Sequence, residues 1–163
     1  MSKYRRDISM KEKEKDIIMK MEMLERVIGQ LYKIYAKKFA SDYSFWIQLS
    51  REEEEHAKLV KELEKEVKQE NLTFDNQRFK VNAIQTTIQY VQKKIKQAND
   101  SSMTERDAYH IALDIENGLL EKNFFKTFKT DQAGLKDVLN KLIHDTAEHR
   151  NRINQKKNNS IAS

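Results

Sequence analysis

Cysteine and proline are absent from this sequence of 163 residues, and glycine occurs only three times. Without cysteine, the chain can form no disulfide, no thiolate nucleophile and no cysteine-ligated metal site. Without proline, and with so few glycines, almost nothing in the sequence would interrupt a helix. We therefore expect an all-α protein.

Long apolar runs are missing as well. No window approaches the ~20 apolar residues that a membrane span needs, and the N-terminal stretch MSKYRRDISMKEKEKD lacks the apolar run of a signal peptide. We expect a cytoplasmic protein that does not contact membranes. The formal net charge is +5, but basic residues alternate with acids, as in KELEKEVKQE. This mixture is typical of a solvated surface, so we do not expect nucleic-acid binding.

Apolar residues recur at steps of three and four, the period of helices that pack in a bundle. The break NLTFDN separates two groups of helices, and no segment has the alternating pattern of a strand. We expect one domain, residues 1–163, with its core at about 10–154 and a frayed polar tail at 155–163. The pattern predicts four long helices in two hairpins and a shorter helix in the crossover, at about residues 10–39, 43–70, 78–98, 105–129 and 132–154.

Helix-capping residues stand at two of the expected helix starts. Ser41 or Asp42 can cap the second helix, because a short polar side chain can accept from the free backbone N–H groups of the first turn. Before the helix that begins near residue 105, a capping box is expected from one of two pairs, Ser102 with Glu105 or Thr104 with Asp107.

Charged side chains interrupt the apolar rows on all four long helices. On the second helix, Glu53 and His56 fill the gap in a row that continues from Leu49 to Val60. The same reading places three more inward-facing residues on the other long helices: Glu25, Glu116 and His149. Burying an unpaired carboxylate costs several kcal/mol, and clustered carboxylates repel each other. A multivalent cation reverses that balance, and carboxylate with imidazole suits iron, manganese or zinc.

The order of these residues also repeats along the chain. Glu25 precedes Glu53 by 28 residues, and His56 follows three residues later. Glu116 precedes residue 146 by 30 residues, and His149 again follows three later. Each hairpin therefore has an acid on its first helix and a pair spaced by three on its second, so that both members of the pair face one side of the helix.

This arrangement resembles the ferritin-like di-iron carboxylate proteins, in which two helices give one Glu each and two give Glu-x-x-His. Three stretches are similar to motifs of the rubrerythrin-type branch: LERVIGQLYKIYA, with its Glu-x6-Tyr spacing from Glu25 to Tyr32, WIQLSREEEEHAKLV and AYHIALDIENGLLEKNFF. The resemblance covers about residues 10–153. A rubredoxin-type domain is excluded because the chain has no cysteine.

The resemblance implies a function and a ligand set. The metal would be iron, two ions per chain, with manganese or zinc as alternatives. Its ligands would be Glu25, Glu53, His56, Glu116 and His149, with Glu53 and Glu116 as the bridging carboxylates. The expected chemistry is that of a ferroxidase or peroxidase: oxidation of Fe(II) by dioxygen or peroxide, in iron handling or oxidative-stress defence. An electron donor and a homodimer are the expected partners.

The sequence departs from that family at one position. Thr146 stands where the last helix of the family carries Glu, three residues before His149. Asp145, four residues before His149, is a further candidate ligand if the helix is locally bulged. Thr146 also favours an alternative: a non-catalytic bundle with a degenerate or absent metal site that acts as a binding or assembly module.

Simpler interpretations accompany several of these residues. Glu53 and His56 can be a hydrogen-bonded core pair, and His149 need not be a ligand. Glu52, Glu54 and Glu55 are expected on the solvated face, and His110 and His144 outside the site. Three tyrosines are expected to be core aromatics with hydrogen-bonded hydroxyls: Tyr32, Tyr35 and Tyr109.

Overall fold

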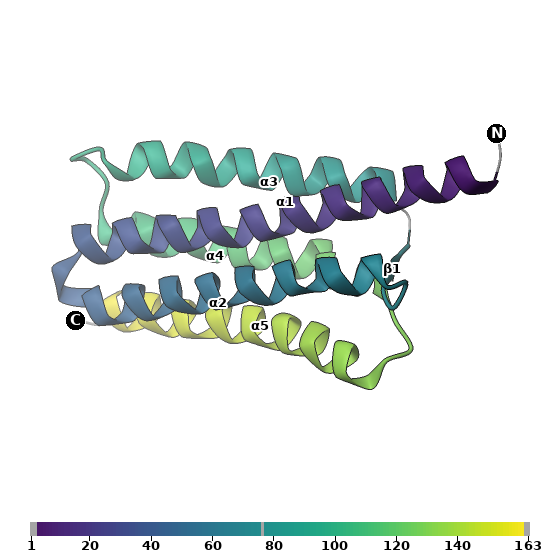
Figure 1. The fold of residues 1–163 in the computed structure, drawn as a ribbon. Coiled ribbons are helices and arrows are strands. Elements are labelled where there is room, and N and C mark those ends of the chain that lie inside the picture. The colour runs from purple at the N-terminus through teal and green to yellow at the C-terminus, as the bar shows by residue number, and fades with distance from the viewer. Residues whose placement is uncertain (1–2, 76, 162–163) are drawn as a thin grey trace.

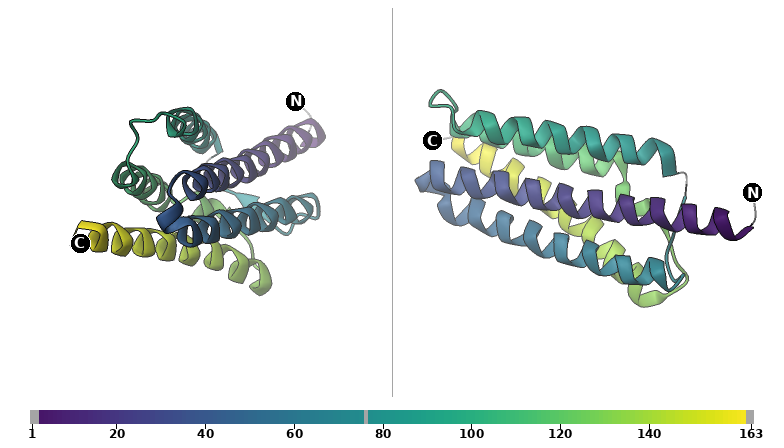
Figure 2. Two further views of the ribbon diagram at one scale, coloured as in Figure 1. Left: turned by 90° about the vertical axis from the view of Figure 1, so that its left-hand side faces the viewer. Right: turned by 45° about the horizontal axis from the view of Figure 1, so that its top comes forward.

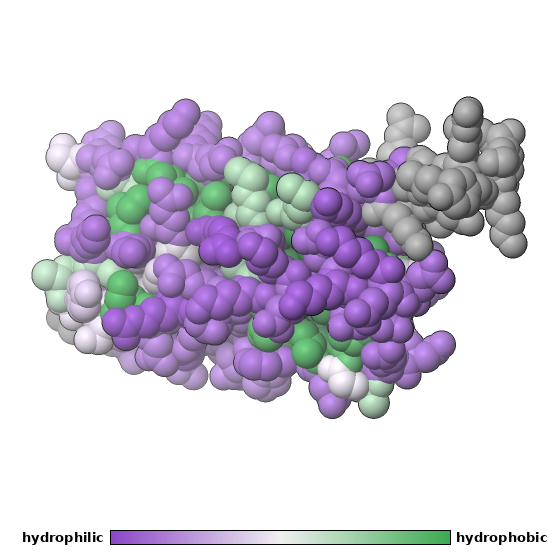
Figure 3. All heavy atoms as spheres, viewed as in Figure 1, coloured by the Kyte–Doolittle hydropathy of each residue, from purple (hydrophilic) through white to green (hydrophobic). Residues whose placement is uncertain are grey.

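The structure, a computed structural model, describes residues 3–75 and 77–161. Five α-helices account for most of this length, which confirms the all-α class expected from the sequence. In chain order the helices are α1 (Lys3–Lys38), α2 (Tyr43–Lys68), α3 (Gln77–Ala98), α4 (Glu105–Lys122) and α5 (Ala133–Ile161). Hydrophilic residues cover most of the face in Figure 3, and apolar residues show mainly along the lines where helices meet.

The long helices pack as two antiparallel pairs (Figure 1). α1 and α2 are joined by a 3-10 turn, Ala40–Asp42, and pack along their length, and α4 packs in the same way on α5. α3 crosses between the pairs and lies on the side of α1 away from α2, as the end view in Figure 2 shows. The expectation that the crossover helix is the shortest is wrong, because α3 has 22 residues and α4 has 18.

The connection from α4 to α5 differs from the sequence expectation. α4 ends at Lys122 rather than near residue 129, because Asn123 adopts a left-handed conformation (φ 49°) that stops the helix. A 3-10 turn, Phe124–Thr127, and a two-residue strand β2, Phe128–Lys129, follow. β2 pairs antiparallel with β1, Thr73–Phe74, although no strand was expected. Two residues are too short to produce an alternating pattern in the sequence.

The last helix is longer than expected. The sequence placed its end near residue 154 with a frayed tail, but α5 continues to Ile161. One side chain of this extension, Lys156, reaches the start of α2, where its ammonium lies 2.7 Å from Asp42 Oδ1 and 5.5 Å from the ring centre of Phe45. These contacts fasten the polar end of α5 to the α1–α2 connection. Residues 162–163 lie outside the described part.

One of the two predicted helix caps forms as expected. Thr104 and Asp107 form the capping box at the start of α4, so the second of the two expected pairs is present. Asp42 is the N-cap residue of α2, but its side chain makes no capping hydrogen bond. Its carboxylate instead accepts from Tyr109 and Lys156.

Gly29 brings α1 and α2 into close approach beside the polar centre. The Ser50 hydroxyl donates a 2.8 Å hydrogen bond to the Gly29 carbonyl. A Cβ at position 29 would lie 3.2 Å from Glu53 Cβ and 3.2 Å from the Ser50 carbonyl oxygen. The missing side chain therefore sets the distance from α1 to the middle of α2.

Gly29→Ala is expected to lower the free energy of unfolding by ~1–3 kcal/mol, because overpacking must push α1 and α2 apart. The matched control is Gly118→Ala, where an added Cβ meets no atom of the described residues within 4 Å. There the better helix propensity of alanine should raise the stability by up to ~1 kcal/mol. Urea unfolding of the two variants checks this, and equal stabilities would show that the approach at Gly29 is not tight.

Candidate metal centre

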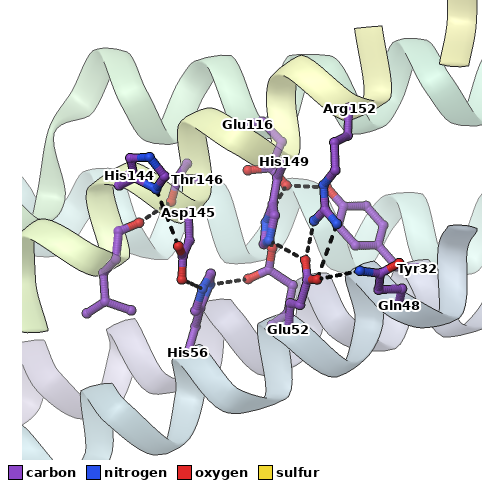
Figure 4. A network of polar contacts seen from close by, with 12 residues as sticks. Tyr32, Gln48, Glu52, His56, Glu116, His144, Asp145, Thr146, His149 and Arg152 are labelled. Carbon is purple, nitrogen blue, oxygen red and sulfur yellow. Dashed lines mark hydrogen bonds and ion pairs between the residues drawn. The ribbon is translucent and has the colours of Figure 1, made fainter. Parts of the chain in front are cut away.

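The five residues predicted to interrupt the apolar rows all lie inside the protein. Their relative exposures range from 0% to 3%. They come from four helices: Glu25 from α1, Glu53 and His56 from α2, Glu116 from α4 and His149 from α5. Figure 4 shows part of this cluster between the helices. The burial predicted from helical spacing is therefore confirmed for each of them.

Glu53 lies between the two imidazoles. One of its oxygens is 3.1 Å from His56 Nδ1 and the other is 2.7 Å from His149 Nδ1. The two rings stack, with centroids 5.1 Å apart. Both Nδ1 atoms therefore face the same carboxylate. Glu53, His56 and His149 each offer a ligand atom, these atoms lie within 4.8 Å of one another, and the three residues could hold a metal ion.

The other two glutamates flank this trio. Glu25 Oε2 lies 4.0 Å from His56 Nδ1, and Glu116 Oε1 lies 3.8 Å from His149 Nδ1. Each glutamate thus stands beside one imidazole, Glu25 on the His56 side and Glu116 on the His149 side. This division follows the two hairpins, because Glu25 and His56 lie on the paired helices α1 and α2, and Glu116 and His149 on the paired helices α4 and α5.

The outer nitrogens of the imidazoles face carboxylates on the opposite helix. His56 Nε2, on α2, lies 3.2 Å from Asp145 Oδ2 on α5, and His149 Nε2, on α5, lies 2.9 Å from Glu52 Oε2 on α2. A carboxylate at the outer nitrogen orients a ring and leaves the inner nitrogen free as a ligand. Each of these two carboxylates also contacts a basic side chain: Lys141 contacts Asp145, and Arg152 contacts Glu52.

Glu52 is the residue that the sequence reasoning missed. It was expected on the solvated face with Glu54 and Glu55, which are indeed exposed, but only 33% of the Glu52 side chain is accessible. A second repeat could have revealed it. Glu52 precedes His56 by four residues, just as Asp145 precedes His149 by four.

Thr146 adds no ligand to the centre. It is buried, and its hydroxyl donates a 2.8 Å hydrogen bond to the Leu142 carbonyl of its own helix. α5 is regular α-helix through this region, without the local bulge considered for Asp145. Asp145 instead turns to His56, so it occupies the place of an orienting group for that imidazole.

Charges within the centre make the pKa values of its carboxyl groups differ widely. Burial alone would raise the pKa of Glu53, but His149 and then His56 hold that pKa far below its usual range. Burial, followed by the charge on Glu53, raises the pKa of Glu25 well above normal and that of Glu116 to about 8. Glu53 is therefore the anion of the metal-free centre, whereas burial and the charge on Glu53 favour the protonated forms of Glu25 and Glu116.

The imidazoles respond to the same anion. Burial opposes the charged form of His149, but Glu53 outweighs it and raises the pKa of His149 to about 10. The pKa of His56 is also raised against the effect of burial, mainly by its contact with Glu53. Glu52, although partly desolvated, has its pKa lowered to about 2 by His149 and Arg152. The metal-free centre thus balances the charge of Glu53 with the His149 imidazolium and favours the charged form of His56 as well.

Two of the three tyrosines behave as expected. The Tyr32 hydroxyl donates a 2.6 Å hydrogen bond to Glu116 Oε1, and Tyr109 donates to Asp42. The Tyr35 hydroxyl has no hydrogen-bond partner among the described residues, so the expectation of a satisfied hydroxyl is wrong there. His144 is 73% exposed at its side chain and does not take part in the centre.

Several buried polar atoms of the centre lack a well-aligned hydrogen bond within the described part of the chain. They are Glu53 Oε1, Glu116 Oε2 and both ring nitrogens of His149. Native proteins rarely leave such atoms unsatisfied, because each costs about 1–3 kcal/mol. A cation at this point could bind Glu53 Oε1, Glu116 Oε2 and His149 Nδ1, while His149 Nε2 faces Glu52, and the donor set of carboxylate and imidazole suits iron, manganese or zinc. The residues present therefore fit a metal.

Comparison with known protein families, with curated proteins and with solved structures finds no match for this chain. The rubrerythrin-type resemblance therefore stays a prediction from the sequence. Across residues 3–75 and 77–161, none of the helices combines the length and apolar character needed to cross a membrane.

Proposed function

We propose that this chain is a ferritin-like protein of the rubrerythrin type. Its helices would bind a redox-active metal, preferably iron, and the protein would act in iron handling or peroxide defence. The observation that carries the proposal is the position of Glu53 between two inward-facing Nδ1 atoms, with unsatisfied buried atoms around it. The arrangement of α1 with α2 and α4 with α5, joined by a crossover, supports the ferritin-like assignment.

In this proposal each residue has a definite role. Glu53, His56 and His149 would form the first ligand set, with Glu25 and Glu116 completing the two sides. Bound iron would supply single electrons to dioxygen or peroxide. The carboxylates neutralise the cation, while Asp145 and Glu52 keep the imidazoles turned inward. Tyr32 fixes Glu116 through its hydroxyl, and the five ligand residues themselves are 0–3% exposed, which limits their contact with bulk water.

Metal binding is expected to release protons and to tighten as the pH rises. The raised pKa values of Glu25, Glu116 and His149 favour the protonated forms of all three groups without metal. Ligation needs ionised carboxylates and a neutral imidazole, so protons compete with the metal most strongly at low pH. The affinity for Mn(II), which is stable in air, should therefore rise between about pH 6 and pH 8.

Titration calorimetry in buffers with different ionisation enthalpies measures this release directly. The heat of Mn(II) binding should change with the buffer in proportion to the protons released. An affinity that does not vary with pH, and a heat that does not vary with the buffer, would mean that none of Glu25, Glu116 and His149 is a ligand.

The function itself is tested by metal content and by Fe(II) oxidation. Protein loaded with Fe(II) without air should retain the metal through gel filtration and rise in melting temperature, because ligand binding stabilises the folded state. Peroxide or dioxygen should then produce the ultraviolet absorption of an oxo-bridged ferric pair. The Glu53→Ala, Glu116→Ala double variant should lose all three effects. An unchanged metal-induced shift in that variant would mean that the ions bind elsewhere.

One observation favours a second function, a non-catalytic bundle that acts as a binding or assembly module. Thr146 offers no ligand, and the ion pairs around Glu52 and Asp145 already compensate much of the charge. This reading predicts purified protein without metal and no consumption of peroxide. The same loading experiment separates the two functions.

A further inference from the structure

Aromatic side chains continue from the polar centre towards the α1–α2 connection. Tyr32, whose hydroxyl is bonded to Glu116, has its ring centre 5.6 Å from that of Trp46. Trp46 in turn stacks on Tyr109, with centroids 5.2 Å apart and planes inclined by 23°. The Tyr109 hydroxyl donates to Asp42. Three rings therefore connect Glu116 with Asp42, without a break in contact.

This series leads from the interior to the surface. Tyr32, Trp46 and Tyr109 are all 0% exposed, whereas the Asp42 side chain is 16% exposed and its partner Lys156 is 41% exposed. The outer end lies where α2 begins and where α5 extends beyond the expected helix end. Packing alone does not require this order, since aliphatic side chains fill comparable core positions elsewhere on α2.

We propose that Tyr32, Trp46 and Tyr109 form a path for single electrons between the metal centre and the surface at Asp42. The proposal rests on the redox function proposed above, and it identifies where the electron donor acts. Successive ring centres are 5.6 Å and 5.2 Å apart, so an electron can cross in short steps rather than in one long transfer. Tyr35 also contacts Trp46, with ring centres 5.1 Å apart, but its hydroxyl has no hydrogen-bond partner among the described residues and so no acceptor for its proton.

Hydrogen bonding gives each ring a different part in the transfer. When Tyr109 is oxidised, its hydroxyl proton passes to Asp42, because an oxidised phenol is a far stronger acid than a carboxylic acid. The Trp46 indole N–H has no hydrogen-bond partner among the described residues. Trp46 therefore keeps its proton when it loses an electron. Its oxidised form is then short-lived, so Trp46 passes the electron on and does not accumulate as a stable radical.

The electron and proton balance closes over one passage. Dioxygen or peroxide at the centre is the oxidant, and a one-electron reductant in solution is the donor. One electron leaves Tyr109 inward by way of Trp46 and Tyr32, and the reductant returns one electron to Tyr109. Asp42 then gives the proton back to the Tyr109 oxygen. Tyr32 likewise passes its hydroxyl proton to the Glu116 carboxylate when it loses its electron, and recovers that proton when the electron is replaced. The chain is unchanged, and one electron has moved from the reductant to the centre.

The path can be tested in the metal-free protein with a tethered photo-oxidant. Because the chain has no cysteine, Ser44→Cys provides a single attachment point for a ruthenium polypyridyl label, on an exposed position beside Asp42. Glu62→Cys is the matched distant site, exposed on the same helix and about 27 Å further along it. After a flash with a sacrificial acceptor, tyrosyl radicals are followed by absorption and paramagnetic resonance.

With the label at residue 44, we expect oxidation of both Tyr109 and Tyr32, with the Tyr32 share identified as the part lost in Tyr32→Phe. Trp46→Phe should abolish the Tyr32 share and leave the Tyr109 share. The label at residue 62 should yield far less Tyr109 radical. An unchanged Tyr32 share in Trp46→Phe, or equal Tyr109 yields from the two labels, would overturn the proposal.

A second form of the test avoids changing the core. Trp46 is the only tryptophan in the chain, so biosynthetic incorporation of a fluorinated tryptophan alters this ring alone. Because that ring is harder to oxidise, the Tyr32 radical should appear more slowly, and an unchanged rate would contradict the path. Neither form of the test needs metal. A negative result would therefore contradict the electron path alone, because the iron-binding function is tested separately by metal loading.

Discussion

Thr146→Glu is expected to increase metal binding and, at the same time, to destabilise the metal-free protein. Thr146 is 5% exposed and lies one turn before His149, so a glutamate there would bring another carboxylate to the buried centre. Without metal, that uncompensated charge should lower the free energy of unfolding by ~3–5 kcal/mol. With metal, the same charge attracts the cation, so the metal-induced rise in melting temperature should exceed that of the natural protein.

Metal stoichiometry distinguishes this effect from simple disruption. The variant should approach two ions per chain and oxidise Fe(II) faster, while the natural protein should hold the ion on the Glu25, Glu53 and His56 side more tightly. Thr146→Gln is the matched control, since it has the same length without the charge and should not add metal. If the natural protein already binds two irons per chain and oxidises Fe(II) rapidly, Thr146 is no handicap and the expectation fails.

The inward positions of the centre were predictable because they depend on helical period alone. Glu25, Glu53 and Glu116 stand in rows whose other members are apolar, and a bundle must bury such rows. The same reasoning placed His56 and His149, and all five are buried. The pattern cannot say which atoms face one another, since the distances around Glu53 depend on how four helices pack.

Helical period did not predict the role of residues at the edge of an apolar row. Glu52 lies ~100° around the helix from Glu53, which suggests solvent when α2 is considered alone. Only the neighbouring α5, with His149 and Arg152 facing it, makes Glu52 part of the centre. The early end of α4 was missed for a related reason, because Asn123 stops the helix through a conformation that has no apolar pattern.

Glu53→Gln is the change expected to affect the centre most, because Glu53 alone among the described residues contacts both imidazoles. The substitution keeps the shape and removes the charge that raises the pKa of His149 from its usual 6.5 to about 10. Leaving the buried His149 imidazolium without its anion should cost ~3–5 kcal/mol at neutral pH. Metal binding should be lost as well, since Glu53 is the centre of the ligand set.

The pH dependence of that loss identifies its origin. A raised pKa of His149 stabilises the natural protein fully below about pH 6.5, and this contribution disappears as the pH rises through about 10. The stability difference between natural and Glu53→Gln protein should therefore shrink as the pH rises across this range. Urea unfolding at several pH values measures it, with the exposed Glu54→Gln as the control for a lost surface charge. A difference that stays constant across the range would attribute the loss to packing, and native Mn(II) affinity in Glu53→Gln would remove Glu53 from the ligands.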